Sequence, residues 1–125
     1  MGLEIEPRTF RVTREDLVAY AEASGDQNPI HQDDEVARSV GLPGVIAHGM
    51  YTLALAARYV EESAGAGKVV AFGAKFTKPV VVPVEGTDVV IEGVLERRDE
   101  QTTMALKVTC EGVEVLRGCK ATLRD

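Results

Sequence analysis

The chain has 125 residues, of which 45% are hydrophobic and 27% charged, and its formal net charge is −6. This composition excludes an intrinsically disordered chain and predicts one globular domain across residues 1–125. The acidic balance disfavours nucleic acid and anionic membranes as partners, and no apolar stretch is long enough to span a bilayer.

The first half of the chain combines short helices with turns. Residues 8–12 alternate and predict a short strand, and Thr13 is typical of a helix start, which leads us to expect a helix over 14–23. After a turn cluster, a short helix is expected from Asp33 to about residue 40. Residues 49–63 predict a longer helix, and because apolar residues cover most of its faces, we expect burial on most sides.

The second half is rich in Val, Thr and Ile, which is typical of strands. Prolines confine residues 80–82 to a sheet edge or an irregular connection, and hairpin turns are expected at 98–101 and 111–112. Four strands are expected, at 68–77, 87–98, 101–110 and 113–123. One buried helix followed by four strands predicts an α+β fold in which an antiparallel sheet wraps around the helix.

The two cysteines and the amino terminus bear on the cellular compartment. Cys110 and Cys119 do not form a CxxC pair, and the first residues show no secretory signal pattern. We therefore expect a cytoplasmic protein with two buried thiols rather than a disulfide.

The segment from Ser24 to His31 carries the strongest chemical signal. It places Asp26 and His31 five residues apart, with a turn-forming Asn28-Pro29 pair between them. A carboxylate and an imidazole can together hold and activate one water for general acid–base catalysis. The alternative is structural, with Asp26 and Asn28 making local turns and His31 capping a helix.

The chain's second histidine, His48, directly precedes the expected long helix. An exposed N–H at a helix start can donate to a developing oxyanion, and Gly49 would permit close approach of a ligand. Alternatively, Gly49 only allows tight packing, and His48 is more typical of a structural hydrogen-bonding residue than of a catalyst.

A metal site is a further alternative. Two histidines and a carboxylate can bind zinc or iron, and His31, His48, Asp33 and Asp34 are the residues available. The sequence lacks the HxH or HExxH spacing that such sites use, so a metal site is disfavoured.

Residues 20–31, followed by Ala47-His48-Gly49-Met50 and residues 75–84, resemble the MaoC-like, or hydratase 2, family of hot-dog proteins. Within it, the chain is most similar to R-specific enoyl-CoA hydratases and actinobacterial 3-hydroxyacyl-carrier-protein dehydratase subunits. The resemblance implies a hot-dog fold, in which a long helix is wrapped by a curved antiparallel sheet.

The resemblance also implies a reaction, the reversible hydration of a 2-enoyl thioester to an (R)-3-hydroxyacyl thioester, without a cofactor. Asp26 and His31 would be the catalytic pair, and the N–H of Gly49 the oxyanion donor. Asn28, His48 and Met50 complete the candidates for supporting the loop and binding substrate. The acyl chain would need an apolar tunnel, for which the candidates are Met50, Tyr51, Leu53, Leu55, Phe72 and Phe76.

The expected partners are an acyl-CoA or acyl-carrier-protein substrate and a second subunit, giving a homodimer or a heterodimer with a related hot-dog chain. Three other functions remain open. These are a hot-dog acyl thioesterase, a non-catalytic subunit of a heterodimeric dehydratase, and a metal-binding module. The presence of both Asp26 and His31 favours the catalytic role.

Overall fold

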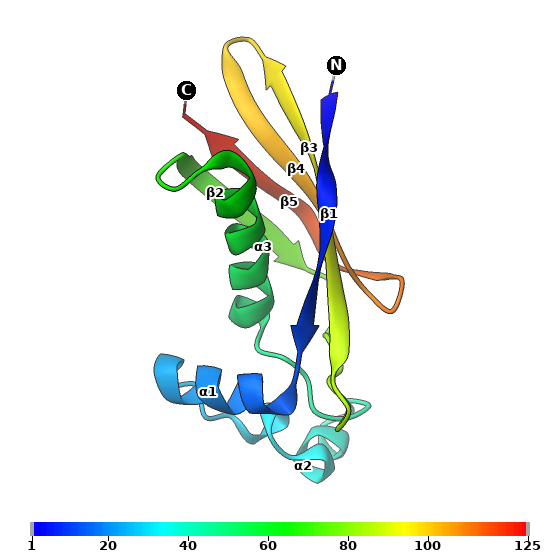
Figure 1. The fold of residues 1–125 in the computed structure, drawn as a ribbon. Helices are drawn as coiled ribbons and strands as arrows, with labels where there is room; N and C mark the ends of the chain where they lie inside the picture. The colour runs from blue at the N-terminus through cyan, green and yellow to red at the C-terminus, as the bar shows by residue number, and fades with distance from the viewer. Residues whose placement is uncertain (1, 125) are drawn as a thin grey trace.

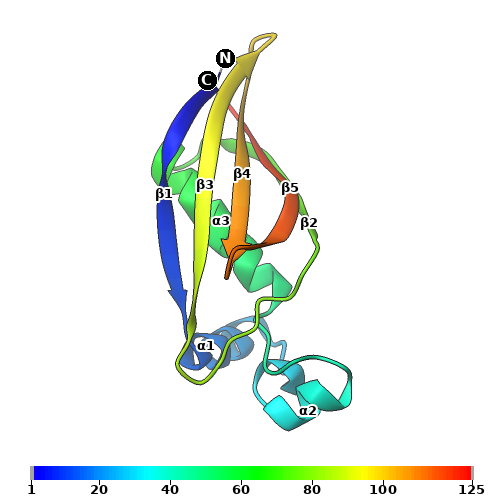
Figure 2. The same ribbon diagram turned by 90° about the vertical axis from the view of Figure 1, so that its right-hand side faces the viewer.

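The computed structural model describes residues 2–124 and shows one five-stranded antiparallel sheet curved around one long helix (Figures 1 and 2). The strands lie in the order β1-β3-β4-β5-β2, so that β1 and β2 form the two edges. Their bounds are Gly2–Val12 (β1), Val69–Phe76 (β2), Thr87–Arg98 (β3), Gln101–Cys110 (β4) and Val113–Leu123 (β5). The predicted α+β hot-dog architecture is confirmed.

The central helix, α3 (Gly49–Ala64), buries one face against the sheet. The buried positions follow the i, i+3, i+4, i+7, i+8 spacing of an amphipathic helix, and they are Thr52, Leu55, Ala56, Tyr59 and Val60. Ala54 and Arg58 on the opposite side are exposed. The expectation of burial on most sides is therefore wrong for the single chain, because small alanines make the outer face apolar in composition without giving it anything to pack against.

The three C-terminal strands match the expected ranges residue for residue. The β3–β4 turn has positive φ at Asp99 and Glu100, and the β4–β5 turn has positive φ at Glu111 and Gly112. Two consecutive positive φ angles define the two-residue hairpin turn whose twist matches that of the flanking strands. Strand β2 also falls within its expected range of 68–77.

Strand β1 begins at Gly2, so the expected strand at 8–12 was too short. Pro7 interrupts the pattern, because it cannot donate a hydrogen bond, and the register against β3 shifts between Ile5 and Arg8. Pairing with β3 on both sides of this irregularity extends the strand to Gly2. An edge strand tolerates such an interruption, since only one of its sides must pair.

Two short helices lie beyond one end of the sheet (Figure 1). In α1 (Arg14–Ser24), Thr13 and Asp16 form a reciprocal capping box, as the sequence predicts. In α2 (Asp34–Ser39), the Asp33 side chain accepts hydrogen bonds from two backbone amides and so serves as the N-cap.

The segment that leads into α3 is fixed by the connection between β2 and β3. Residues 77–86 contain no strand, but the Ala47 N–H donates to the Val80 carbonyl over 2.9 Å and the Val82 N–H donates to the Val45 carbonyl over 2.9 Å. The expectation of an irregular connection at 80–82 is confirmed. These bonds hold the residues just before His48 at a defined place, which sets where α3 begins.

Both cysteines are buried and free, as expected. Within residues 2–124, none of the helices has the length and apolar character that crossing a membrane requires.

Candidate active site

The loop after α1 is shaped by its own side chains. Gly25 adopts a left-handed conformation, with φ 83°, and ends the helix. The Asp26 carboxylate then accepts from the Asn28 N–H over 3.2 Å, and the Asn28 side chain accepts from the Ile30 N–H over 3.2 Å. A single 3₁₀ turn, Pro29–His31, follows. This succession of Asx turns brings His31 back toward Asp26.

His31 is buried and its ring orientation is fixed. Its Nδ1 lies 2.8 Å from the carbonyl oxygen of Ile46, and its side chain is only 8% exposed. Because a carbonyl oxygen can only accept, the hydrogen of a neutral ring is on Nδ1 and the lone pair is on Nε2. Nε2 is therefore the atom available for proton transfer.

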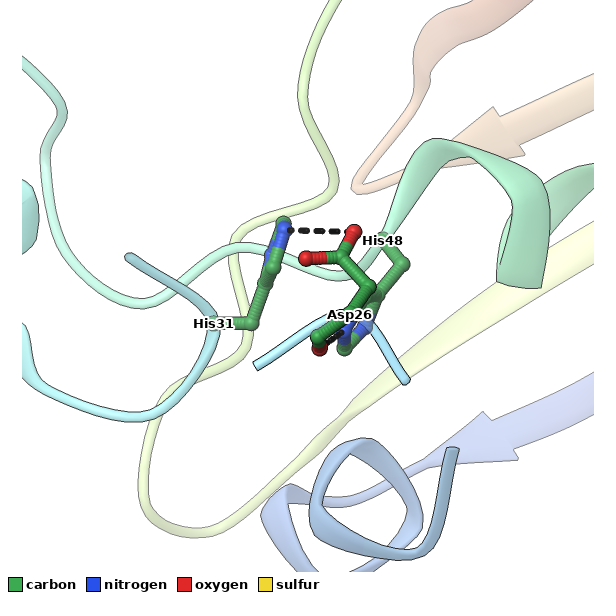
Figure 3. Close-up of side chains that lie close together, drawn as sticks. All are labelled: Asp26, His31 and His48. Carbon is green, nitrogen blue, oxygen red and sulfur yellow. Dashed lines mark hydrogen bonds and ion pairs between the residues drawn. The ribbon is translucent and has the colours of Figure 1, made fainter. Parts of the chain in front are cut away.

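This Nε2 faces Asp26 (Figure 3). The distance from His31 Nε2 to Asp26 Oδ2 is 4.0 Å, and the Asp26 side chain is 53% exposed. A direct hydrogen bond is shorter than this, but one water at ordinary hydrogen-bond length from both atoms fits the separation, with an angle of about 90° at its oxygen. The structure thus brings the two residues that the sequence singles out close enough to hold one water between them.

His48 lies on the other side of His31. The two rings stack, with centroids 3.8 Å apart and planes 24° apart, and Nε2 of His48 lies 3.1 Å from the Asp26 carbonyl oxygen. His48 is the N-cap residue of α3, but its side chain makes no capping hydrogen bond. Its buried ring hydrogen-bonds the loop, as the structural role that the sequence favours for it requires.

Gly49 is the first residue of α3, and the first N–H groups of a helix have no intrahelical acceptor. Gly49 lines a pocket of about 270 Å³ together with Phe76 and Lys78. A methyl group on Gly49 would lie 3.1 Å from the Phe76 ring, so the glycine keeps this end of the pocket open. Asp26 and His31 do not line this pocket, but Ile46, whose carbonyl holds His31, does.

The other residues expected to form an acyl tunnel lie elsewhere. Met50 is 58% exposed, and of the six tunnel candidates only Phe76 lines the pocket. The remaining apolar lining comes from the segment before α3, from the connection after β2 and from β5, namely Ile46, Ala47, Pro79, Val80, Val115 and Leu116. These were missed because nothing in their local sequence separates a pocket wall from ordinary core.

Of the four residues named for a metal site, the structure brings His31 and His48 together but leaves Asp33 and Asp34 elsewhere. Asp33 caps α2, and Asp34 binds Val45 and Arg14. The Val45 N–H, and next the Arg14 guanidinium, hold the pKa of the Asp34 carboxyl below its usual range. The described group whose ligand atoms lie close, within 4.8 Å, is instead Asp26, His31 and His48. Stacked rings direct their lone pairs within separate planes, which suits tetrahedral zinc poorly.

Two contributors to the site could not be found from the sequence. The carbonyl of Ile46 sets the tautomer of His31, yet any residue could supply it. Tyr20 packs against His48 with ring centroids 4.8 Å apart. Its only sequence signal is its position on the helix that leads into Asp26.

Comparisons with known proteins agree with this fold. Residues 3–113 match the model of the family described as MaoC like domain. A 3-hydroxyacyl-thioester dehydratase X from Mycobacterium tuberculosis is 39% identical over 84 residues, which cover 67% of this chain and 29% of the relative. The chain thus spans less than a third of that relative's length.

Solved structures are similar over nearly the whole chain. A MaoC-like dehydratase superposes with a TM-score of 0.94 at 32% identity, covering 99% of this chain and 40% of the other. The unliganded R-hydratase PhaJ1 from Pseudomonas aeruginosa superposes with a TM-score of 0.84 at 28% identity, covering 98% of this chain and 79% of the other. With most of its residues matched by the family model and its fold shared with these structures, the chain belongs to the MaoC-like domain family.

Proposed function

We propose that this protein catalyses the reversible hydration of 2-enoyl thioesters to (R)-3-hydroxyacyl thioesters, with Asp26 and His31 acting on one water. The observation that carries the proposal is the 4.0 Å separation between Asp26 Oδ2 and His31 Nε2, with Nδ1 of His31 tied to the Ile46 carbonyl. The family supports this reaction class, since relatives and structural neighbours are named dehydratases and R-hydratases.

The hydrogen bond from His31 Nδ1 to the Ile46 carbonyl supports the following order of proton transfers. In hydration, an O–H bond of the water breaks, its oxygen bonds to the β-carbon, and the proton goes to Nε2 of His31. The electron pair of the C=C bond moves toward the thioester oxygen, and the α-carbon then takes a proton from the Asp26–His31 pair. Asp26 accepts the second hydrogen of the water and so orients its lone pair. Dehydration reverses these steps through the same groups.

The start of α3 stabilises the charge that develops on the thioester oxygen. The Gly49 N–H has no intrahelical acceptor, and the helix dipole adds a partial positive charge at this end. The acyl chain lies in the adjoining pocket, where Phe76, Val80 and Leu116 give an apolar wall. Lys78, which also lines this pocket, supplies a cation toward the phosphates of a CoA or carrier-protein thioester.

The test is the rate of hydration of crotonyl-CoA and of a longer enoyl-CoA, measured as the decrease in the enoyl-thioester absorbance. We expect Asp26→Asn and His31→Ala each to lower kcat/KM by ~100- to 10,000-fold, the range for loss of a general acid or base. The double variant should lose little more kcat/KM than the less active of the two single variants, because both residues act on the same water.

Asp99→Asn is the matched control for Asp26→Asn. Asp99 lies in the β3–β4 turn with a positive φ, which asparagine adopts readily, and that turn is at the opposite end of the sheet from α1 (Figure 1). Turnover within a few-fold of wild type in both site variants would reject the assignment. Release of free thiol from a saturated acyl-CoA would indicate a thioesterase instead.

The partner and compartment complete the proposal. Strand β2 is a sheet edge whose Val70 and Phe76 are exposed, so we expect two copies, or this chain and a related hot-dog subunit, to pair there. The two buried free thiols suit the reducing cytoplasm. Sedimentation of the purified chain alone distinguishes a homodimer from a monomer that needs another subunit.

A further inference from the structure

The side chain of His48 contacts both members of the proposed catalytic pair. It is 2% exposed, its Nε2 lies 3.1 Å from the Asp26 carbonyl oxygen, and its ring stacks on His31 with centroids 3.8 Å apart. Figure 3 shows Asp26 lying against both imidazole rings. The sequence separates His48 from Asp26 by 22 residues, so this contact exists only in the folded chain.

Further along the loop, the Ile46 N–H donates to the Ile30 carbonyl over 3.2 Å and the Ile46 carbonyl holds His31, so residues 30 and 31 are tied to the segment before α3. The other hydrogen bonds of residues 25–28 in the described part of the chain are local and reach no further than five residues, as from Gln32 to Gln27. Local turns fix the shape of a loop but not its position relative to the sheet and α3. Within residues 25–28 of the described chain, the bond from His48 is therefore the one hydrogen bond that ties the Asp26 backbone to α3.

The state of the His48 ring is also determined. A carbonyl acceptor requires the hydrogen on Nε2, which leaves a lone pair on Nδ1. Nδ1 is buried and has no hydrogen-bond partner among residues 2–124. The ring therefore acts on the site through its Nε2–H and through the face that stacks on His31.

The ring has little freedom to move. Tyr20 packs against it at a tilt of 59°, and Tyr20 in turn packs edge-on against Tyr51 of α3. His31 lies against it as well. Rotating His48 out of its place would break the bond to Asp26 and displace one of these rings.

We propose that His48 is a positioning residue that holds Asp26 through its Nε2–H and His31 through ring stacking, and keeps both in register with the adjoining Gly49 N–H. This inference rests on the proposed function for its catalytic consequence. Because His48 and Gly49 are neighbours in the chain, one residue sets the distance between the water-activating pair and the oxyanion donor.

Two substitutions separate the two contacts. His48→Phe keeps a ring to stack on His31 but removes the donor to Asp26, and it replaces the unpartnered Nδ1 by carbon. His48→Gln retains an N–H near the position of Nε2 but removes the ring. We expect kcat to fall on the order of 10- to 100-fold in His48→Phe with KM changed by less than threefold, since misplacement by about 1 Å costs this much. In His48→Gln we expect a smaller loss.

The control readouts are the thermal midpoint and the amide hydrogen exchange of residues 25–28. We expect His48→Phe to unfold at or above the wild-type temperature while its loop amides exchange at least tenfold faster, and His48→Gln to keep wild-type loop exchange. Wild-type kcat and wild-type loop exchange in His48→Phe would overturn the inference. So would a loss of activity that merely follows a lower thermal midpoint. If Asp26→Asn and His31→Ala retain activity, the proposed function fails, and the exchange rates still decide whether His48 tethers the loop.

Discussion

Replacing Gly93 by alanine tests how closely the sheet fits over α3. Gly93 lies on β3, and a Cβ built there would lie 3.0 Å from Leu106, 3.1 Å from Tyr59 and 3.3 Å from Met104. Tyr59 and Met104 are 2% and 1% exposed, so neither can move into solvent. Tyr59 is also held by its hydroxyl, which donates to the Glu6 carbonyl over 2.9 Å. The glycine thus makes room for the tyrosine of the central helix.

The expected cost combines two opposing effects. Overpacking a well-filled core costs about 1–3 kcal/mol, and three tight contacts with buried side chains place Gly93→Ala in the upper half of that range. Losing the flexibility of glycine in the unfolded chain offsets about 0.4–1 kcal/mol. We therefore expect the free energy of unfolding to fall by about 1–2.5 kcal/mol, and the thermal midpoint by roughly 4–10 °C.

The assay is urea and thermal unfolding at one protein concentration, with Ala105→Val as the control. Ala105 is exposed on the neighbouring β4, so its added methyl groups meet solvent and should change stability by less than about 0.5 kcal/mol. Combining Gly93→Ala with Tyr59→Leu should cost at least about 0.5 kcal/mol less than the sum of the two single changes, because the smaller side chain relieves the contact. Unchanged stability in Gly93→Ala, or strict additivity with Tyr59→Leu, would refute the reasoning.

Three further outcomes follow from individual side chains. Burial raises the pKa of the Cys119 thiol from 9.0 to about 11, so the free energy of unfolding should decline as pH rises from 9 toward 11. A thiol reagent at pH 8 should label Cys119 only after unfolding, and rapid labelling of the native protein would contradict this. The Val45 N–H and Arg14 hold the pKa of Asp34 below 3.8. The difference in the free energy of unfolding between wild type and Asp34→Asn should therefore be largest near neutral pH and disappear as pH falls below 3.8. A difference that stays constant with pH in urea titrations would argue against the linkage. Asp33→Ala should cost about 1 kcal/mol in urea unfolding, because its carboxylate accepts from two amides at the start of α2, whereas Asp33→Ser should recover most of the loss; equal losses would exclude a capping role.

The sequence predicts those parts of the fold that depend on local pattern. Strands β3, β4 and β5 follow from alternation and from turn residues, and the capping box at Thr13 follows from short-range chemistry. The start of β1 was missed because Pro7 reads locally as an interruption, whereas pairing with β3 on both sides continues the strand. Tertiary pairing outweighed the local signal there.

The site divides in the same way. The approach of Asp26 to His31 depends on the turn at residues 24–31, and the sequence spacing of the two residues predicts it. The bond from His48 to Asp26 depends on how α3 lies in the sheet, so no local pattern encodes it. The pocket beside Gly49 likewise depends on β5 residues far along the chain, such as Leu116.

The two edges of the sheet are chemically unequal, and this limits assembly. At β1, Pro7 lacks a backbone donor, whereas every residue of β2 keeps its own, although the register of β2 against β5 shifts twice. Two copies that join through β2 use up the border on which each has all its backbone donors, and a third copy meets only the border that contains the proline. A pyrrolidine ring near the amino terminus thereby acts as a stop against ribbon-like polymers.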